Sequence, residues 1–300
     1  MSIAFCSRPA APDTEVRAML LGLFAVALFS LTLPFTRMAV GELDPLFLAL
    51  GRALGAAVLA AAWLAWKRAP LPPRAALLPL ILVAAGCIVG YPLLTSIALR
   101  TVPAGHGALL VGVLPLATTL YAALRDFERP SRAFWAMAAV GSGLVALFAL
   151  VEGGGGLHAA DLLMFAAVLL AAMGYAEGGR LSRTLGGPQT ICWALLLAAP
   201  VLLPILLWQG LPPADVSARS WFAFGYVTVM STMVGFFLWY RALALGGVAR
   251  VGQVQLLQPF LSLLGAAVLL GEALTLGNCL FALAVAAVVF ARRQMAVHRQ

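Results

Sequence analysis

Charged side chains are scarce in this sequence. Asp, Glu, Lys and Arg make up 10% of its 300 residues, whereas a typical soluble domain carries roughly 25%. Hydrophobic residues make up 63%, and the mean hydropathy is +1.01. A chain with so few charges cannot cover a water-exposed surface. The composition therefore excludes a soluble domain and predicts a membrane protein.

Histidine, lysine and cysteine are also rare, and this excludes several kinds of site. None of the three histidines stands in a His-Glu-x-x-His pattern, and the chain has no Gly-x-Ser-x-Gly, so an intramembrane enzyme lacks its catalytic groups. The one lysine, Lys67, has no phosphate-binding loop around it and lies outside the apolar runs, which excludes an ATP-driven pump and a retinal protein. The four cysteines lie far apart and predict neither a disulfide nor a metal site. We expect no enzyme activity, no metal and no cofactor.

Long apolar runs fill most of the chain. A transmembrane helix needs about 20 apolar residues, and the first run has no small-residue cleavage site, so we expect it to remain as a span. The sequence predicts an all-α membrane protein with ten transmembrane helices, at about 17–40, 45–66, 75–99, 103–124, 131–151, 159–182, 187–208, 219–244, 248–270 and 275–291.

Basic residues lie mainly on one side of these spans. Loops that face the cytoplasm are enriched in Lys and Arg. If both termini are cytoplasmic, the outer side holds only Arg37, Arg100 and Arg219 among the 19 basic residues. The basic residues stand singly or in pairs, which argues against nucleic-acid binding. We expect a multi-pass protein of the bacterial inner membrane with both termini in the cytoplasm.

Two halves of the chain carry matching residues. Arg37 and Pro45 match Arg180 and Pro188 at an offset of 143, while Ala98, Pro115 and Glu128 match Ala242, Pro259 and Glu272 at an offset of 144. The offsets predict two repeats at 17–151 and 159–291, a linker at 152–158, and cytoplasmic tails at 1–16 and 292–300. Five spans per half is an odd number, so the second repeat must be inverted. Inverted repeats are typical of transporters that work by alternating access.

Several short motifs point to a known family. They are Arg100-Thr101-Val102-Pro103-Ala104-Gly105, Leu114-Pro115-Leu116, Tyr240-Arg241-Ala242-Leu243, Gln258-Pro259-Phe260 and Gly271-Glu272-Ala273-Leu274. With them the chain resembles the drug/metabolite transporter superfamily, in its ten-helix branch of two EamA-type domains, and its layout is most similar to amino-acid exporters of the YddG type. The resemblance implies export through a central cavity lined by the first four helices of each half, with the fifth at the periphery. Asp126-Phe127-Glu128 departs from the family's Gly-Glu, which weakens any role for that loop.

Glu177 is a candidate site residue because it lies inside the sixth predicted span. A charge there is costly unless it is paired or hydrated. It is interpreted either as a proton-coupling or amine-binding carboxylate, or as an interfacial residue paired with Arg180.

Further polar and aromatic residues are candidates for the lining of a cavity. Gln255 and Gln258 share one face of the ninth span, and amides in a bilayer need partners or a hydrated cavity. Tyr91 and Thr95 lie one turn apart in the third span. We also expect Trp239 of the eighth span to face inward, in place of the rival stripe at Tyr226, Met230, Met233, Phe237 and Tyr240. Ser30 is a further candidate, whereas Arg52 is expected to extend to the outer surface of the membrane.

Two transport functions remain open at this stage. The first is facilitated export of small neutral or aromatic amino acids, and the second is proton-coupled multidrug export that uses Glu177. A channel or a receptor also stays possible. We expect a small-molecule substrate, the lipid bilayer as partner, and a functional monomer, because one chain supplies both halves of a pathway.

Overall fold

The computed structural model describes residues 12–125, 158–247 and 251–292, with a few isolated positions between 136 and 147. Every regular element in these ranges is helical. Seven helices in the described part are long and apolar enough to cross a membrane, and Val254–Leu270 and Leu276–Ala287 are shorter apolar helices. The predicted fifth span, 131–151, falls largely outside the described residues. The count of ten spans stays a prediction.

The first four predicted spans are each formed by one or more helical segments. The first combines α1 (Pro12–Ser30) and α2 (Thr32–Ala39), and the second is α3 (Pro45–Trp66). The third combines η1 (Arg74–Ala76), α4 (Leu77–Val83), η2 (Ala84–Gly90) and α5 (Tyr91–Ala98), and the fourth combines α6 (Ala104–Val111) and α7 (Leu114–Arg125).

The remaining spans belong to the second predicted repeat. The sixth is α9 (Ala159–Leu185) and the seventh is α10 (Gly187–Gln209). The eighth combines α11 (Ala218–Tyr226), η3 (Val227–Gly235) and α12 (Phe236–Gly246), the ninth combines η4 (Gly252–Leu257) and α14 (Gln258–Leu270), and the tenth is α15 (Leu276–Arg292).

Local sequence signals fix where these helices begin and end. Asp44 caps α3, since its carboxylate accepts hydrogen bonds from the backbone N–H of Leu46 at 2.8 Å and of Phe47 at 3.4 Å, and Pro45 occupies the first turn. Glycines with φ between +70° and +90° stand directly after α9, α10, α12 and α14. Only glycine adopts this conformation without steric cost, and a helix ends there.

Two irregular segments recur at matching positions in the two halves. η2 and η3 are both π-helical; their first residues lie 143 residues apart and their last residues 145 apart. α7 and α14 begin at Leu114 and Gln258, 144 residues apart, each directly before a proline. Pro259 has no N–H for the Gln255 carbonyl, which accepts from the Gln258 N–H instead. These shared breaks agree with the repeat hypothesis.

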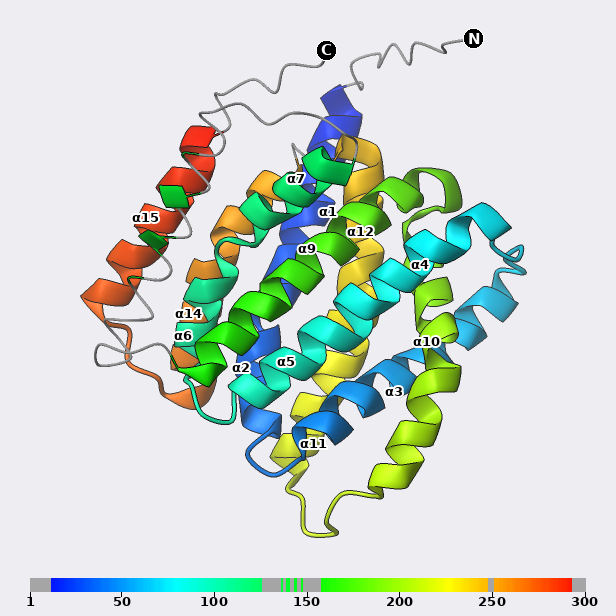
Figure 1. Ribbon diagram of the computed structural model, residues 1–300, viewed down its shortest axis with the longest axis horizontal. Coiled ribbons are helices and arrows are strands. Elements are labelled where there is room, and N and C mark those ends of the chain that lie inside the picture. Colours follow the sequence, from blue (N-terminus) through cyan, green and yellow to red (C-terminus); the bar gives the residue numbers. More distant parts are fainter. Residues whose placement is uncertain are drawn as a thin grey trace.

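The helices form one bundle, in which the start of α1 and the end of α15 lie at the same end (Figure 1). We call this end the terminus side and the opposite end the far side. α15 lies at one edge of the bundle (Figure 1), as the family resemblance implies for a fifth helix of a half. That the terminus side faces the cytoplasm stays a prediction.

Close helix contacts in the centre depend on glycine. An added Cβ at Gly174 of α9 would lie 2.3 Å from Sγ of Cys87, and one at Gly178 would lie 2.2 Å from the Tyr240 ring. α9 therefore packs directly on η2 and α12, and its contact with η2 brings the two predicted halves together around the site described next.

Candidate functional site

A small cavity lies in the middle of the bundle. Its lining takes five residues from each predicted half: Phe29, Thr32, Arg52, Cys87 and Tyr91 from the first, and Ala171, Tyr175, Ser231, Phe236 and Gln258 from the second. The centre of a water-sized sphere can occupy only ≈ 20 Å³ of it, which is room for about one water molecule. A larger molecule can enter only if the helices around the cavity move apart.

Arg52 forms the charged part of the wall. Its side chain is 3% exposed, and its Nε and Nη2 donate hydrogen bonds to Oγ1 of Thr232 at 3.0 and 2.8 Å. Nη2 also donates to Oγ of Ser231 at 3.3 Å, and Ser231 shares a hydrogen bond of 2.8 Å with Thr32. The expectation that Arg52 extends to the membrane surface is therefore wrong. The hydroxyls of η3 hold its guanidinium inside the bundle.

Aromatic rings form the opposite part of the wall. Phe29 contacts Phe236 and Tyr175 with ring centroids 5.1 and 6.2 Å apart, and Trp239 lies 5.6 Å from Tyr175. Tyr240 packs on Phe236 at 5.3 Å and donates a hydrogen bond to the Gly174 carbonyl at 3.0 Å. α12 runs from η3 toward the terminus side, so this aromatic cluster closes the cavity on that side. Arg52 and the hydroxyls lie nearer the far side.

Two of the candidates from the sequence, Tyr91 and Gln258, line the cavity. Ser30 lies close by, since its hydroxyl donates to the carbonyls of Val26 at 2.7 Å and of Gln258 at 3.4 Å. The Thr95 hydroxyl donates to the Tyr91 carbonyl of its own helix at 2.7 Å. Trp239 is buried behind Tyr175 and Phe29.

Gln255 and Glu177 are not among the lining residues. Gln255 is buried, and its Nε2 has no hydrogen-bond partner among the described residues. Glu177 is 1% exposed and accepts hydrogen bonds from Arg125 at 3.0 Å, Arg180 at 2.7 Å and Tyr121 at 3.0 Å. The predicted pairing with Arg180 is present, while a role of Glu177 in binding substrate stays a prediction.

Comparison with known proteins identifies the family. The EamA-like transporter family matches residues 16–151 and again residues 158–291. An uncharacterized transporter, YdeK of Bacillus subtilis, is 45% identical over 259 residues, which cover 84% of this chain and 88% of that protein. The chain belongs to the EamA-like transporter family.

Two further similarities extend this finding. A protein of Streptantibioticus cattleyicolor described as a probable terminal-alkyne amino-acid exporter is 31% identical to this EamA-like transporter, over 67% of this chain and 68% of its own. A solved crystal structure superimposes with a TM-score of 0.64 at 20% identity and covers 94% of this chain and 100% of its own. That likeness shows a shared fold.

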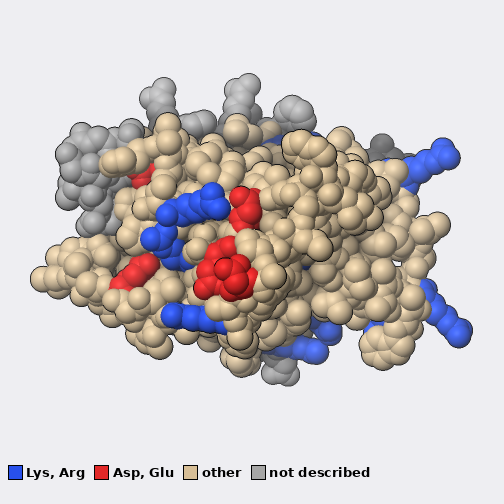
Figure 2. Space-filling view, turned by 90° about the horizontal axis from the view of Figure 1, so that it is seen from below, with Lys and Arg blue, Asp and Glu red and all other residues tan. Residues whose placement is uncertain are grey.

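On the far side of this EamA-like transporter, the two halves are joined by polar contacts. Glu272, the second residue after α14, accepts hydrogen bonds from the first N–H groups of α6, those of Ala104 and Gly105, each at 2.8 Å. A carboxylate is stabilised at such a helix N-terminus. Acidic and basic side chains gather on this face of the molecule (Figure 2).

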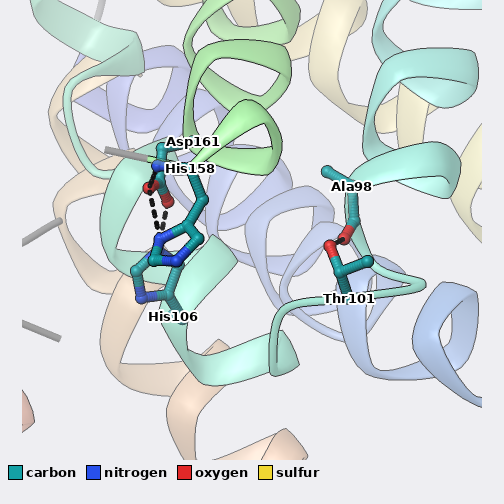
Figure 3. Close-up of polar contacts among 5 residues, drawn as sticks. All are labelled: Ala98, Thr101, His106, His158 and Asp161. Carbon is teal, nitrogen blue, oxygen red and sulfur yellow. Dashed lines mark hydrogen bonds and ion pairs between the residues drawn. The ribbon is translucent and has the colours of Figure 1, made fainter. Parts of the chain in front are cut away.

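Two more contacts join the halves on the far side. His106 of α6 lies 2.6 Å from Asp161 of α9, which also accepts from the His158 N–H at 3.0 Å (Figure 3). Glu42, between α2 and α3, accepts hydrogen bonds from the backbone N–H of Ser217 at 2.6 Å and from its hydroxyl at 2.9 Å. These hydrogen bonds lower the pKa of Glu42 below its ordinary value, because they stabilise the ionised carboxylate.

On the terminus side of the transporter, Glu177 joins the halves. It belongs to α9 of the second half, and its contacts with Tyr121 and Arg125 reach α7 of the first half. Together with the aromatic cluster, this contact closes the side opposite to Glu272. The cavity therefore lies between two sets of contacts that join the halves.

Sequence reasoning missed most of the lining. Both Trp239 and Tyr240 of the rival stripe are buried, although the sequence predicts that only one of the two stripes faces inward. The π-helical segments interrupt the regular spacing from which the two stripes were drawn. For Arg52 a signal was available, since a charge within an apolar run is a default functional candidate. Phe29, Tyr175 and Phe236 are aromatics in apolar runs and carry no distinguishing pattern.

Proposed function

We propose that this transporter exports small neutral or aromatic amino acids across the bacterial inner membrane, through the cavity between its two halves. The observation that carries the proposal is the two-sided wall of the cavity. Arg52 and the hydroxyls of Thr32 and Ser231 offer donors for a carboxylate, while Phe29 and Phe236 offer an apolar surface for a side chain. An amino acid has both features in one small molecule.

Alternating access is supported by where the contacts between halves lie. The Glu272 contact with α6 and the Glu177 contact with α7 stand on opposite sides of the cavity. If one set opens while the other stays closed, the cavity faces one side of the membrane at a time. π-helical segments are frequent at functional sites, and η2 and η3 both contribute lining residues. In an inverted repeat, η2 and η3 would play equivalent roles, one in opening the cavity to one side of the membrane and the other in opening it to the opposite side.

The alternative, proton-coupled export of cationic drugs, is less well supported. None of the ten described lining residues is acidic, and Arg52 places a positive charge in the wall. Glu177, the carboxylate that this mechanism needs, is paired with Arg125 and Arg180. The name of the Streptantibioticus relative, which refers to amino-acid export, agrees with the first function. Because one chain supplies both walls, we propose a functional monomer.

Counterflow of labelled amino acids in proteoliposomes tests the proposal. Unlabelled amino acids and cationic dyes are added as competitors, with and without a pH gradient. We expect saturable exchange of neutral and aromatic amino acids that does not need the gradient. Competition by cationic dyes alone, and only with the gradient present, would instead favour the drug/proton exchanger.

A further inference from the structure

Arg52 is a buried charge whose hydrogen-bond partners among the described residues are all neutral hydroxyls. The contacts described above use its Nε and Nη2, while Nη1 makes no hydrogen bond with any described residue. Among the described residues, no Asp or Glu lies within ion-pair distance of it. A guanidinium has five N–H donors, so part of its donor capacity is left over inside the bundle.

A charge in this position is costly unless something compensates it. Moving an ion out of water carries a penalty that neutral hydroxyls offset only in part. Thr232 and Ser231 fix the orientation of the guanidinium, yet they leave its charge uncompensated. A merely structural link between α3 and η3 would need no charge, because a neutral amide could make it. The arrangement is suited to an anion that enters the cavity.

We propose that Arg52 binds the carboxylate of the transported molecule and thereby selects carboxylic acids against their amides and amines. This inference rests on the proposed function, since it assigns the substrate class to the same cavity. Arginine suits the task because its planar fork matches a carboxylate with two parallel hydrogen bonds. The hydroxyl of Tyr91 and the amide of Gln258, both in the lining, can accept hydrogen bonds from the amino group.

The test measures how three related molecules compete for exchange of labelled phenylalanine in proteoliposomes. The competitors are phenylalanine, phenylalaninamide and phenethylamine, which share the ring and differ at the carboxyl group. The proteins are the wild type, Arg52→Gln, Arg52→Lys and a control, Arg219→Gln. Arg219 is an exposed arginine on the far side that donates to the Leu269 carbonyl at 2.7 Å, away from the lining.

The wild type should prefer the acid to the amide by about ten- to a hundredfold, the range for a hydrogen bond to a charged group. Arg52→Gln should reduce this ratio to within about threefold, and Arg52→Lys should give an intermediate ratio because it cannot form the fork. Arg219→Gln should keep the wild-type ratio. A defect of folding alone would lower the amount of active protein and leave the ratio unchanged.

The outcomes separate this inference from the proposed function. If the wild type exchanges no amino acid, the proposed function itself fails. If the wild type exchanges phenylalanine but takes the amide equally well, the role of Arg52 is refuted without any variant. A wild-type ratio in Arg52→Gln also refutes it. If Arg52→Gln shows no exchange, the acid-to-amide ratio of Arg52→Lys is used instead. A wild-type ratio in Arg52→Lys would then overturn the inference.

Discussion

The contact between Glu272 and the start of α6 gives the sharpest prediction about gating. Its two carboxylate oxygens accept one hydrogen bond each from Ala104 and Gly105. Glu272→Gln keeps one acceptor oxygen and removes the charge. A charge-assisted hydrogen bond contributes about 1.5–3 kcal/mol, and partial exposure of Glu272 brings this nearer to the ~1–2 kcal/mol of a helix cap. We therefore expect the far side to open about 5–30 times more often.

The native cysteine of the cavity can report this opening. In a protein that keeps only Cys87, with Cys6, Cys192 and Cys279 replaced by alanine, a membrane-impermeant thiol reagent is added outside intact cells. The rate of Cys87 modification should rise about 5–30-fold in Glu272→Gln. The matched control is Asp215→Asn, an exposed far-side carboxylate with no described hydrogen bond, and it should leave the rate unchanged. An unchanged or lower rate in Glu272→Gln would refute the reasoning.

Three further predictions concern the terminus side, the packing and the pH dependence. Glu177→Gln should slow the modification of Cys87 from outside by about two- to fivefold, as expected for ~0.5–1 kcal/mol from a buried carboxylate whose two arginine partners are partly exposed to solvent. If exchange also loses its pH dependence, Glu177 carries protons, and if neither the exchange rate nor its pH dependence changes, that proton-coupling role is ruled out. Gly174→Ala should destabilise the protein by about 1–3 kcal/mol, since the new Cβ would lie 2.3 Å from Sγ and 3.1 Å from the backbone N of Cys87. The melting temperature in detergent should therefore fall. The control Gly225→Ala, whose new Cβ would have no atom within 4 Å, should leave the melting temperature unchanged. The lowered pKa of Glu42 means that its contact with Ser217 is kept above the ordinary value of 4.5 and is lost as the pH falls through the lowered pKa. Cys87 should therefore be modified faster in Glu42→Gln than in the wild type at neutral external pH, and the two rates should converge at strongly acid pH, where loss of the thiolate slows both alike; equal rates at both pH values would show that Glu42 plays no part.

The positions of the long apolar helices among the described residues were largely readable from the sequence. The span predicted at 45–66 coincides with α3 (Pro45–Trp66), because a proline after an N-capping Asp44 marks its start and Lys67 its end. The short motifs were enough to recognise the family. The family model matches residues 16–151 and 158–291, one match over each predicted half. Hydropathy and end signals act locally, which is why a single sequence is enough to recognise them.

The wall of the cavity could not be predicted in the same way. Which side of a helix faces inward depends on its neighbours, and in η2 and η3 the regular spacing of 3.6 residues per turn is itself interrupted. Arg52 was assigned to the surface because no residue near it in the sequence indicates that Thr232, 180 residues further along the chain, accepts its hydrogen bonds. Partners so distant in sequence become visible only when the helices are placed in space.

The most direct test of the central claim is whether substrate and Cys87 compete for the same space. Proteoliposomes that contain the variant with Cys87 as its only cysteine are treated with the thiol reagent, with and without saturating phenylalanine, and counterflow is then measured. The account predicts that phenylalanine slows the modification and that the modified protein no longer exchanges amino acids. Full modification at an unchanged rate, with exchange intact, would contradict it, because the transported molecule would then take another path.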